Sequence, residues 1–139
     1  MTGRRFLDTN ILVYTDAADQ PARQAVAIDL VARCRRDGTG VVSTQVLNEY
    51  FVTTTRKLGV DPVVARRKVE LFGQLTTVPT ALDDIIAAID LHRLHGLHYW
   101  DALVIRSAQQ AGCVELFTED MQDERRFEGL TIINPFLVR

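Results

Sequence analysis

An acid at the end of an expected strand is the first residue that could do chemistry. The apolar pair Phe6-Leu7 runs into Asp8, and the apolar run 11–14 follows two residues later. This pattern predicts a buried strand that ends at Asp8 and continues into a helix. Ligands of open α/β sheets bind outside the carboxyl ends of the strands, so Asp8 would face a ligand crevice. The alternative is that Asp8 or Thr9 only caps the helix.

Two further acids are expected near the same edge. Asp120 follows the expected strand 115–118, although it also lies in the acidic run 119–124, which is typical of a solvated turn. Glu49 lies in the second turn of a helix that begins just after the expected strand 41–43. It stands at the border of the apolar stripe of that helix. A simple surface glutamate is the alternative.

Asp101 opens a helix that is apolar on all sides. The residues after it are Ala102-Leu103-Val104-Ile105, and a helix of this kind is buried. An acid at the start of a buried helix either interacts with the helix dipole or points into a site. The sequence therefore offers four acids, Asp8, Glu49, Asp101 and Asp120, that could meet at one edge.

A cluster of four carboxylates needs a counter-charge. Two carboxylates about 4 Å apart repel by about 4 kcal/mol at an effective dielectric constant of about 20, and a divalent cation would remove that cost. Oxygen ligands without histidine favour Mg²⁺ or Mn²⁺ over zinc. Such an ion can activate a bound water and stabilise a leaving oxygen. These residue types point to phosphodiester hydrolysis.

The elements that would position these acids alternate between short strands and long helices. This order predicts an α/β domain with a parallel sheet covered on both faces. Crossovers are right-handed, so the carboxyl ends of the strands share one edge. Further strands are expected at 76–78, on an edge, and at 130–133. Helices are expected over 22–36, 44–58, from Pro62 after an Asp61 cap, over 81–95 after a Thr80 cap, and over 99–111.

Composition limits the class of protein. The 139 residues suit one domain, and with 47% hydrophobic residues and a net charge of −2 the chain is not a broadly basic nucleic-acid coat. No apolar run approaches the roughly 20 residues of a membrane span, and no signal peptide is visible. Cys34 and Cys113 are far apart and suit buried thiols in a reducing cytosol. We expect a cytoplasmic protein with no membrane partner.

Two other classes that place an acid after the first strand fit less well. A haloacid-dehalogenase-like phosphatase needs a second aspartate two residues later, where this chain has Asn10. A receiver-like signalling module needs a lysine at a late strand end, and Lys57 and Lys68 are the only lysines.

At these residues the chain resembles the PIN-domain nucleases, most closely the VapC-type toxins of bacterial toxin–antitoxin pairs. The likeness covers nearly the whole chain. It is carried by four stretches: Phe6-Leu7-Asp8-Thr9-Asn10, residues 43–49, Trp100-Asp101-Ala102, and Leu116-Phe117-Thr118-Glu119-Asp120 with Ile133-Asn134-Pro135-Phe136.

The resemblance implies a single PIN domain over residues 1–139, with a three-layer α/β/α fold and a mainly parallel sheet of about five short strands. It implies an endoribonuclease that uses Mg²⁺, or Mn²⁺ in its place, and leaves a 3′-hydroxyl and a 5′-phosphate. The partners it implies are an RNA substrate, a small antitoxin and a second copy in a homodimer. A PIN fold that binds RNA or a partner without cutting is the alternative, against which the intact acidic quartet argues.

Site roles are also carried over from the resemblance, residue by residue. The acidic quartet matches Asp8, Glu49, Asp101 and Asp120, of which Asp8, Asp101 and Asp120 would hold the metal. Supporting roles fall to Asn10, Ser43 and Thr118, and Asp123 would be an accessory acid.

Overall fold

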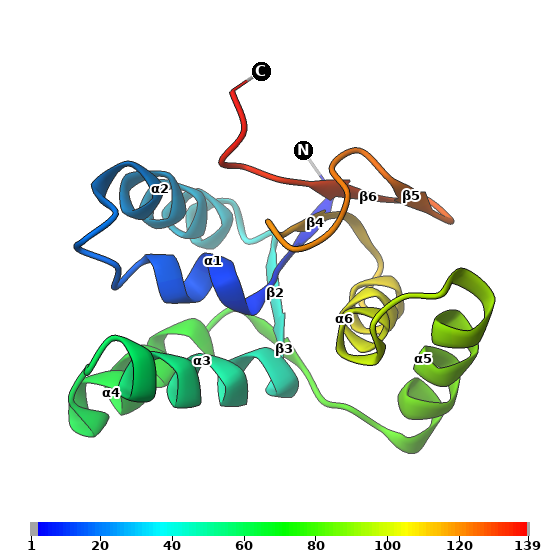
Figure 1. The fold of residues 1–139 in the computed structure, drawn as a ribbon, viewed down its shortest axis with the longest axis horizontal. Coiled ribbons are helices and arrows are strands. Elements are labelled where there is room, and N and C mark those ends of the chain that lie inside the picture. The colour runs from blue at the N-terminus through cyan, green and yellow to red at the C-terminus, as the bar shows by residue number, and fades with distance from the viewer. Residues whose placement is uncertain (1–2, 139) are drawn as a thin grey trace.

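The computed structural model describes residues 3–138, which form one mixed sheet with helices on both faces (Figure 1). In the described residues the sheet has six strands in the order β3-β2-β1-β4-β6-β5. Every neighbouring pair is parallel except β5 with β6. The strands are β1 (Arg4–Leu7), β2 (Gly40–Ser43), β3 (Thr76–Val78), β4 (Cys113–Phe117), β5 (Arg126–Phe127) and β6 (Leu130–Ile133).

The helices divide into two layers. Figure 1 shows α1 to α4 on one side of the sheet and α5 and α6 on the other, which gives the α/β/α arrangement expected from the alternating pattern. The described helices are α1 (Thr9–Tyr14), α2 (Pro21–Asp37), α3 (Thr44–Lys57), α4 (Pro62–Phe72), α5 (Leu82–His95) and α6 (Tyr99–Gln110).

The expectation of about five strands is corrected to six. The additional strand, β5, contains only Arg126 and Phe127 and pairs antiparallel with β6. With only two residues, β5 is too short to show an apolar pattern in the sequence. It is recognised as a strand only by its pairing with β6. The carboxyl ends of the five parallel strands nevertheless lie on one edge, as predicted.

One predicted helix cap is wrong. The residue that caps α5 is Ala81, not Thr80. Ala81 has no side-chain acceptor, and Asp84 reaches back instead, so that its Oδ2 accepts a hydrogen bond from the Ala81 N–H at 2.9 Å. The acid three residues into the helix therefore replaces the expected hydroxyl.

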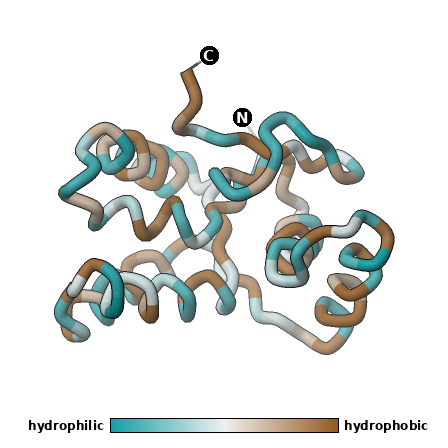
Figure 2. The backbone as a smooth tube through the Cα atoms, viewed as in Figure 1, coloured by the Kyte–Doolittle hydropathy of each residue, from teal (hydrophilic) through white to brown (hydrophobic). Residues whose placement is uncertain are grey.

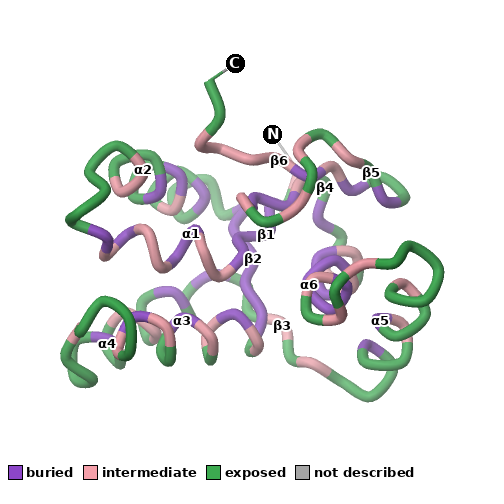
Figure 3. The backbone as a smooth tube through the Cα atoms, viewed as in Figure 1, coloured by how far each residue is buried: buried purple, intermediate pink, exposed green. Residues whose placement is uncertain are grey.

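Burial follows the sheet and α6. Figure 3 shows buried residues along the central strands and around α6, where Ala102 to Ile105 are all buried as predicted. Cys34 and Cys113 are buried free thiols, which also confirms the interpretation from the sequence. In the part of the chain that the structure describes, no helix combines the length and apolarity needed to traverse a lipid bilayer.

Two outer helices expose apolar side chains. The sequence predicts an apolar face of Val63, Val64, Val69, Leu71 and Phe72 for α4. This prediction is only partly correct, since Phe72 is buried whereas Val63, at 77% exposure, and Val64 are not. The reason is that α4 is the outermost helix of its layer and packs mainly against α3. Figures 2 and 3 together show hydrophobic residues on exposed parts of α5, and these are Leu82, Ile85, Ile86, Ile89 and Leu94.

Candidate acidic site at the carboxyl edge of the sheet

Asp8 lies between β1 and α1, next to the middle of the sheet. Its side chain is only 5% exposed. One carboxylate oxygen, Oδ1, accepts a hydrogen bond from the Thr9 N–H at 2.7 Å, and the other, Oδ2, accepts one from the Thr118 hydroxyl at 2.8 Å. Asp8 is therefore the N-cap of α1 and also part of a contact with a residue 110 positions away. The structure confirms that Asp8 caps the helix, and its role in a ligand site stays a prediction.

Thr118 and Asn10 join the first acid to the last. The Thr118 hydroxyl oxygen accepts hydrogen bonds from Asn10 Nδ2 at 3.1 Å and from the Asp120 N–H at 3.1 Å. These two bonds occupy its lone pairs and leave its proton for Asp8. Asn10 Nδ2 also donates to Asp120 Oδ2 at 3.0 Å. A chain of polar contacts thus runs from Asp8 through Thr118 and Asn10 to Asp120.

Glu119, next to Asp120, has a different role. Its carboxylate accepts hydrogen bonds from the Tyr14 hydroxyl and from Arg23 Nη1, each at 2.6 Å. The Arg23 pair balances the charge of Glu119. Asp120 instead faces Asn10, a neutral amide, so the acidic turn presents Asp120 and not Glu119 to the site.

Asp101 belongs to the same electrostatic neighbourhood. The pKa of Asp8 is raised from 3.8 to about 7, mainly by burial and also by the charges of Asp120 and Asp101, while the hydrogen bonds from Thr118 and Thr9 act in the opposite direction. The pKa of Asp101 is also raised. Burial is the largest cause, and the charges of Asp120 and Glu49 add to it, while His98 acts in the opposite direction. Each of the four acids therefore interacts electrostatically with at least one of the others.

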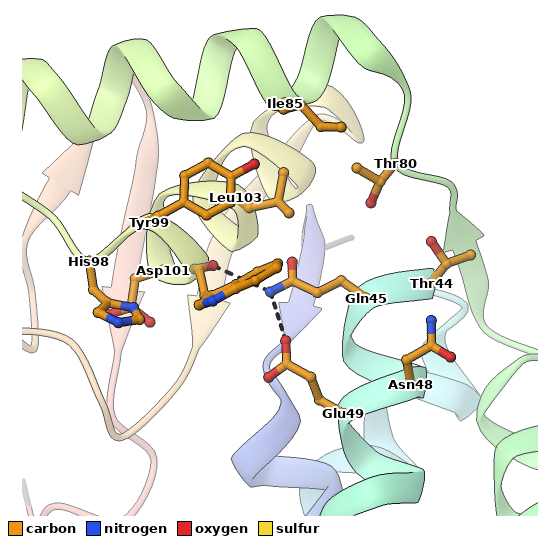
Figure 4. Close-up of a pocket in the computed structure, with 11 residues that line it drawn as sticks. Thr44, Gln45, Asn48, Glu49, Thr80, Ile85, His98, Tyr99, Asp101 and Leu103 are labelled. Atoms are coloured by element: carbon orange, nitrogen blue, oxygen red, sulfur yellow. Dashed lines mark hydrogen bonds between the residues drawn. The ribbon is translucent and has the colours of Figure 1, made fainter.

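Glu49 is the acid that α3 contributes. Its Oε1 accepts a hydrogen bond from Gln45 Nε2 at 2.8 Å. Glu49 and Asp101 both line a pocket of about 800 Å³ between the beginnings of α3 and α6 (Figure 4). Gln45 was not singled out in the sequence, although it shares a helix face with Glu49 because it lies four residues before it.

The remaining predicted residues make local structural contacts. Ser43 is buried and caps α3, its hydroxyl accepting from the Val46 N–H at 3.3 Å. Asp123 Oδ1 accepts from the Asn134 N–H at 2.7 Å and so ties the acidic turn to the segment after β6.

The donor set suits a hard cation. All four acids offer carboxylate oxygens, and the neighbouring charges that raise the pKa of Asp8 come from other acids, so a divalent cation would relieve an existing repulsion. Among residues 3–138, no three His, Cys, Asp or Glu side chains are gathered closely enough to hold one ion. The side chains would have to move inward to share a metal.

Comparisons with known proteins identify the family of this chain. A family model described as the PIN domain matches residues 5–127. The chain belongs to the PIN-domain family. No curated protein matches its sequence significantly.

Several solved structures share this PIN fold. The crystal structure of VapC20 from Mycobacterium tuberculosis, described as a sarcin–ricin loop cleaving toxin, has a TM-score of 0.65 at 19% identity over 81% of this chain and 86% of that one. A toxin–antitoxin complex from Klebsiella pneumoniae has a TM-score of 0.62 at 18% identity, with 96% and 99% covered. VapBC2 from Rickettsia felis, bound to a DNA fragment from its promoter, has a TM-score of 0.65 at 16% identity, with 92% and 96% covered. At these identities the likeness shows a shared fold.

Proposed function

We propose that this PIN domain is a metal-dependent endoribonuclease and the toxin of a toxin–antitoxin pair. The observation that carries the proposal is the position of Asp8. It is a buried carboxyl at the carboxyl edge of the sheet whose acidic neighbours, Asp101 and Asp120, raise its pKa further. Family membership favours this function over the phosphatase-like and receiver-like alternatives, and the fold likeness to VapC20 supports a toxin.

In this proposal Asp8, Asp101 and Asp120 hold Mg²⁺, which Mn²⁺ can replace. The ion would supply a water of lowered pKa and a counter-charge for the leaving oxygen. Thr118 and Asn10 keep two of the carboxylates in place through the bonds described above. These bonds orient the two carboxylates, but no three acids among residues 3–138 are close enough to share an ion, so the side chains would still have to move inward when an ion arrives.

The proposed reaction is hydrolysis of one phosphodiester bond. The oxygen of water bonds to phosphorus, the bond from phosphorus to the 3′-oxygen breaks, and a proton passes to that oxygen. The products are a 3′-hydroxyl and a 5′-phosphate. In this proposal Glu49, whose carboxylate is held by Gln45, accepts a proton from the attacking water.

A small antitoxin is the proposed protein partner, because two of the similar structures are described as toxin–antitoxin or VapBC assemblies. The exposed apolar residues of α5 offer a surface suited to a protein contact. Two further expectations stay predictions. The first is that the protein forms a homodimer. The second is that it is located in the cytoplasm, where it would encounter RNA and the antitoxin.

The test compares Asp8→Asn and Asp101→Asn with the unaltered protein on cellular RNA in Mg²⁺. We expect both variants to lose cleavage while keeping the fold, as seen by circular dichroism. Asp83→Asn, at an exposed position of α5, serves as the matched control and should cleave normally. Mapping of new 5′ ends after brief expression would identify the RNA and the cut site. Cleavage by both site variants at the rate of the unaltered protein would refute the assignment.

A further inference from the structure

We propose that the pocket between α3 and α6 binds one unpaired RNA base next to the phosphate that is cut. In this proposal Trp100 is the stacking surface, and Gln45 and Asn48 contact the edge of the base. The inference rests on the proposed nuclease function and adds to it the form of RNA that is recognised.

The pocket adjoins the acid group directly. Glu49 and Asp101 line it, and its volume of about 800 Å³ lies within the range of about 300–1,000 Å³ that is typical of small-ligand pockets. Figure 4 shows Thr44, Gln45 and Asn48 projecting from α3, with Tyr99, Asp101 and Leu103 on the facing helix α6. A group bound here would be a near neighbour of any phosphate held by the acids.

Trp100 is an exception within α6. Ala102 to Ile105 are buried, whereas Trp100 is 54% exposed and lines the pocket. Its ring stands edge-to-face against Tyr99, with ring centroids 5.2 Å apart and planes at 70°. The Trp100 carbonyl also accepts a hydrogen bond from Gln45 Nε2 at 3.4 Å. An exposed aromatic ring restrained by these contacts is suited to stacking on a base.

Gln45 carries an unused acceptor. Its Nε2 is engaged by Glu49 and by the Trp100 carbonyl, which determines which end of the amide is the oxygen. That oxygen, Oε1, is buried and has no hydrogen-bond partner among the described residues. A buried acceptor without a donor is costly, and an N–H on the edge of a base would satisfy it. Asn48, exposed on the next turn of α3, offers a second amide to the same pocket.

The chemistry of the lining favours a base over a phosphate. Of the described residues that line the pocket, none is lysine or arginine. Neutral amides beside an aromatic ring match a flat, uncharged heterocycle. A base in a duplex has its edge paired and its faces stacked, so only an unpaired base could enter.

Fluorescence gives a readout that does not depend on cleavage, because Trp100 is the only tryptophan in the sequence. We would titrate a single-stranded RNA, and the same sequence as a blunt duplex, into the unaltered protein with Mg²⁺ at low temperature. The expected result is saturable quenching by the single strand and none by the duplex. Equal quenching by both, or by neither, would overturn the proposal.

Kinetics give the second readout. Trp100→Ala should raise KM for single-stranded RNA by about 5- to 150-fold, equivalent to about 1–3 kcal/mol at 1.36 kcal/mol per tenfold change, with kcat largely kept. Trp100→Phe should retain most of the affinity, and Gln45→Ala should raise KM and alter the preferred base at the cut. Val63→Ala, which truncates a side chain that is 77% exposed on α4, is the control and should leave KM unchanged.

The outcomes separate this inference from the proposed function. Cleavage with an unchanged KM in Trp100→Ala overturns the base pocket and leaves the nuclease standing. Quenching by single-stranded RNA without any cleavage refutes the nuclease and supports the base pocket. If Trp100→Ala cleaves normally but no longer binds the antitoxin, the pocket belongs to the protein partner and the inference is wrong.

Discussion

In the absence of metal, the buried acid Asp8 should make the free energy of unfolding depend on pH. The substitution Asp8→Asn is expected to remove this dependence. The Asp8 carboxyl is 5% exposed, and its pKa is raised from 3.8 to about 7 in the folded protein. A raised pKa means that the folded state binds the proton more tightly than the unfolded state does. The contribution of Asp8 to stability is therefore fully present below pH 3.8 and is lost as the pH rises through about 7.

The size of the effect follows from the two pKa values. Between pH 5 and pH 8 the free energy of unfolding should fall by about 2–3 kcal/mol because of Asp8 alone. Asparagine carries no charge, so the variant should lack this part of the slope. The amide keeps only one acceptor oxygen, so one of the two bonds, from Thr118 or from the Thr9 N–H, would be lost. This loss costs about 1–3 kcal/mol at every pH and so cancels in a comparison between pH values.

The assay is urea unfolding of both proteins in EDTA at pH 5, 6, 7 and 8, followed by tryptophan fluorescence. The unfolding free energy of the unaltered protein minus that of Asp8→Asn should fall with rising pH. Other groups, including Asp101 with its own raised pKa, are present in both proteins and drop out. A difference that stays constant from pH 5 to pH 8 would refute the view of Asp8 as a buried acid without a counter-charge.

Metal addition extends the same experiment. At pH 8, Mg²⁺ at 100 times its dissociation constant should raise the unfolding free energy of the unaltered protein by about 2.7 kcal/mol. The rise should shrink towards pH 5, where protons compete for Asp8, and should be much smaller in Asp8→Asn. Equal stabilisation of both proteins would exclude Asp8 as a ligand.

Two further predictions concern supporting contacts. Thr118→Val keeps the shape of the side chain but removes the donor to Asp8. It should lower the unfolding free energy by about 1–3 kcal/mol and move the pH-dependent fall in stability described above to higher pH. Thr118→Ser, which keeps the hydroxyl, should do neither. Asp84 is buried, caps α5 and pairs with Arg106 at 3.0 Å, so Asp84→Ala should cost about 1–3 kcal/mol in urea unfolding. The adjacent, exposed Asp83→Ala is the control and should stay within about 0.5 kcal/mol; equal effects of the two substitutions would contradict the role given to the buried acid.

Local pattern was sufficient for most of the elements. The apolar pair before Asp8 and the apolar run after it correctly predicted a strand and a helix. Asp61 caps α4 as expected, its Oδ1 accepting from the Val63 N–H at 2.8 Å. These predictions succeed because capping and periodicity involve residues only a few positions apart.

The errors arise where contacts with other elements decide the outcome. β5 exists because β6 pairs with it, and two residues are too short to carry a period. Val63 and Val64 are apolar yet exposed because α4 has no further layer to cover it. Periodicity shows which side chains could be buried, and the neighbouring elements decide which of them are.

The sequence by itself determined the placement of the acids on the chain: Asp8 and Asp120 follow strands, Asp101 lies in the first turn of its helix, and Glu49 lies in the second turn of its helix. Only the tertiary structure decided how these acids differ. It pairs Glu119 with Arg23, 96 residues away, and turns Asp120 towards Asn10. It also buries Asp8 where the nearby charges of Asp101 and Asp120 are acidic. The burial of an acid and the charges around it depend on which parts of the chain lie close together in space. The order of the strands in the sheet determines this, and no local stretch of sequence does.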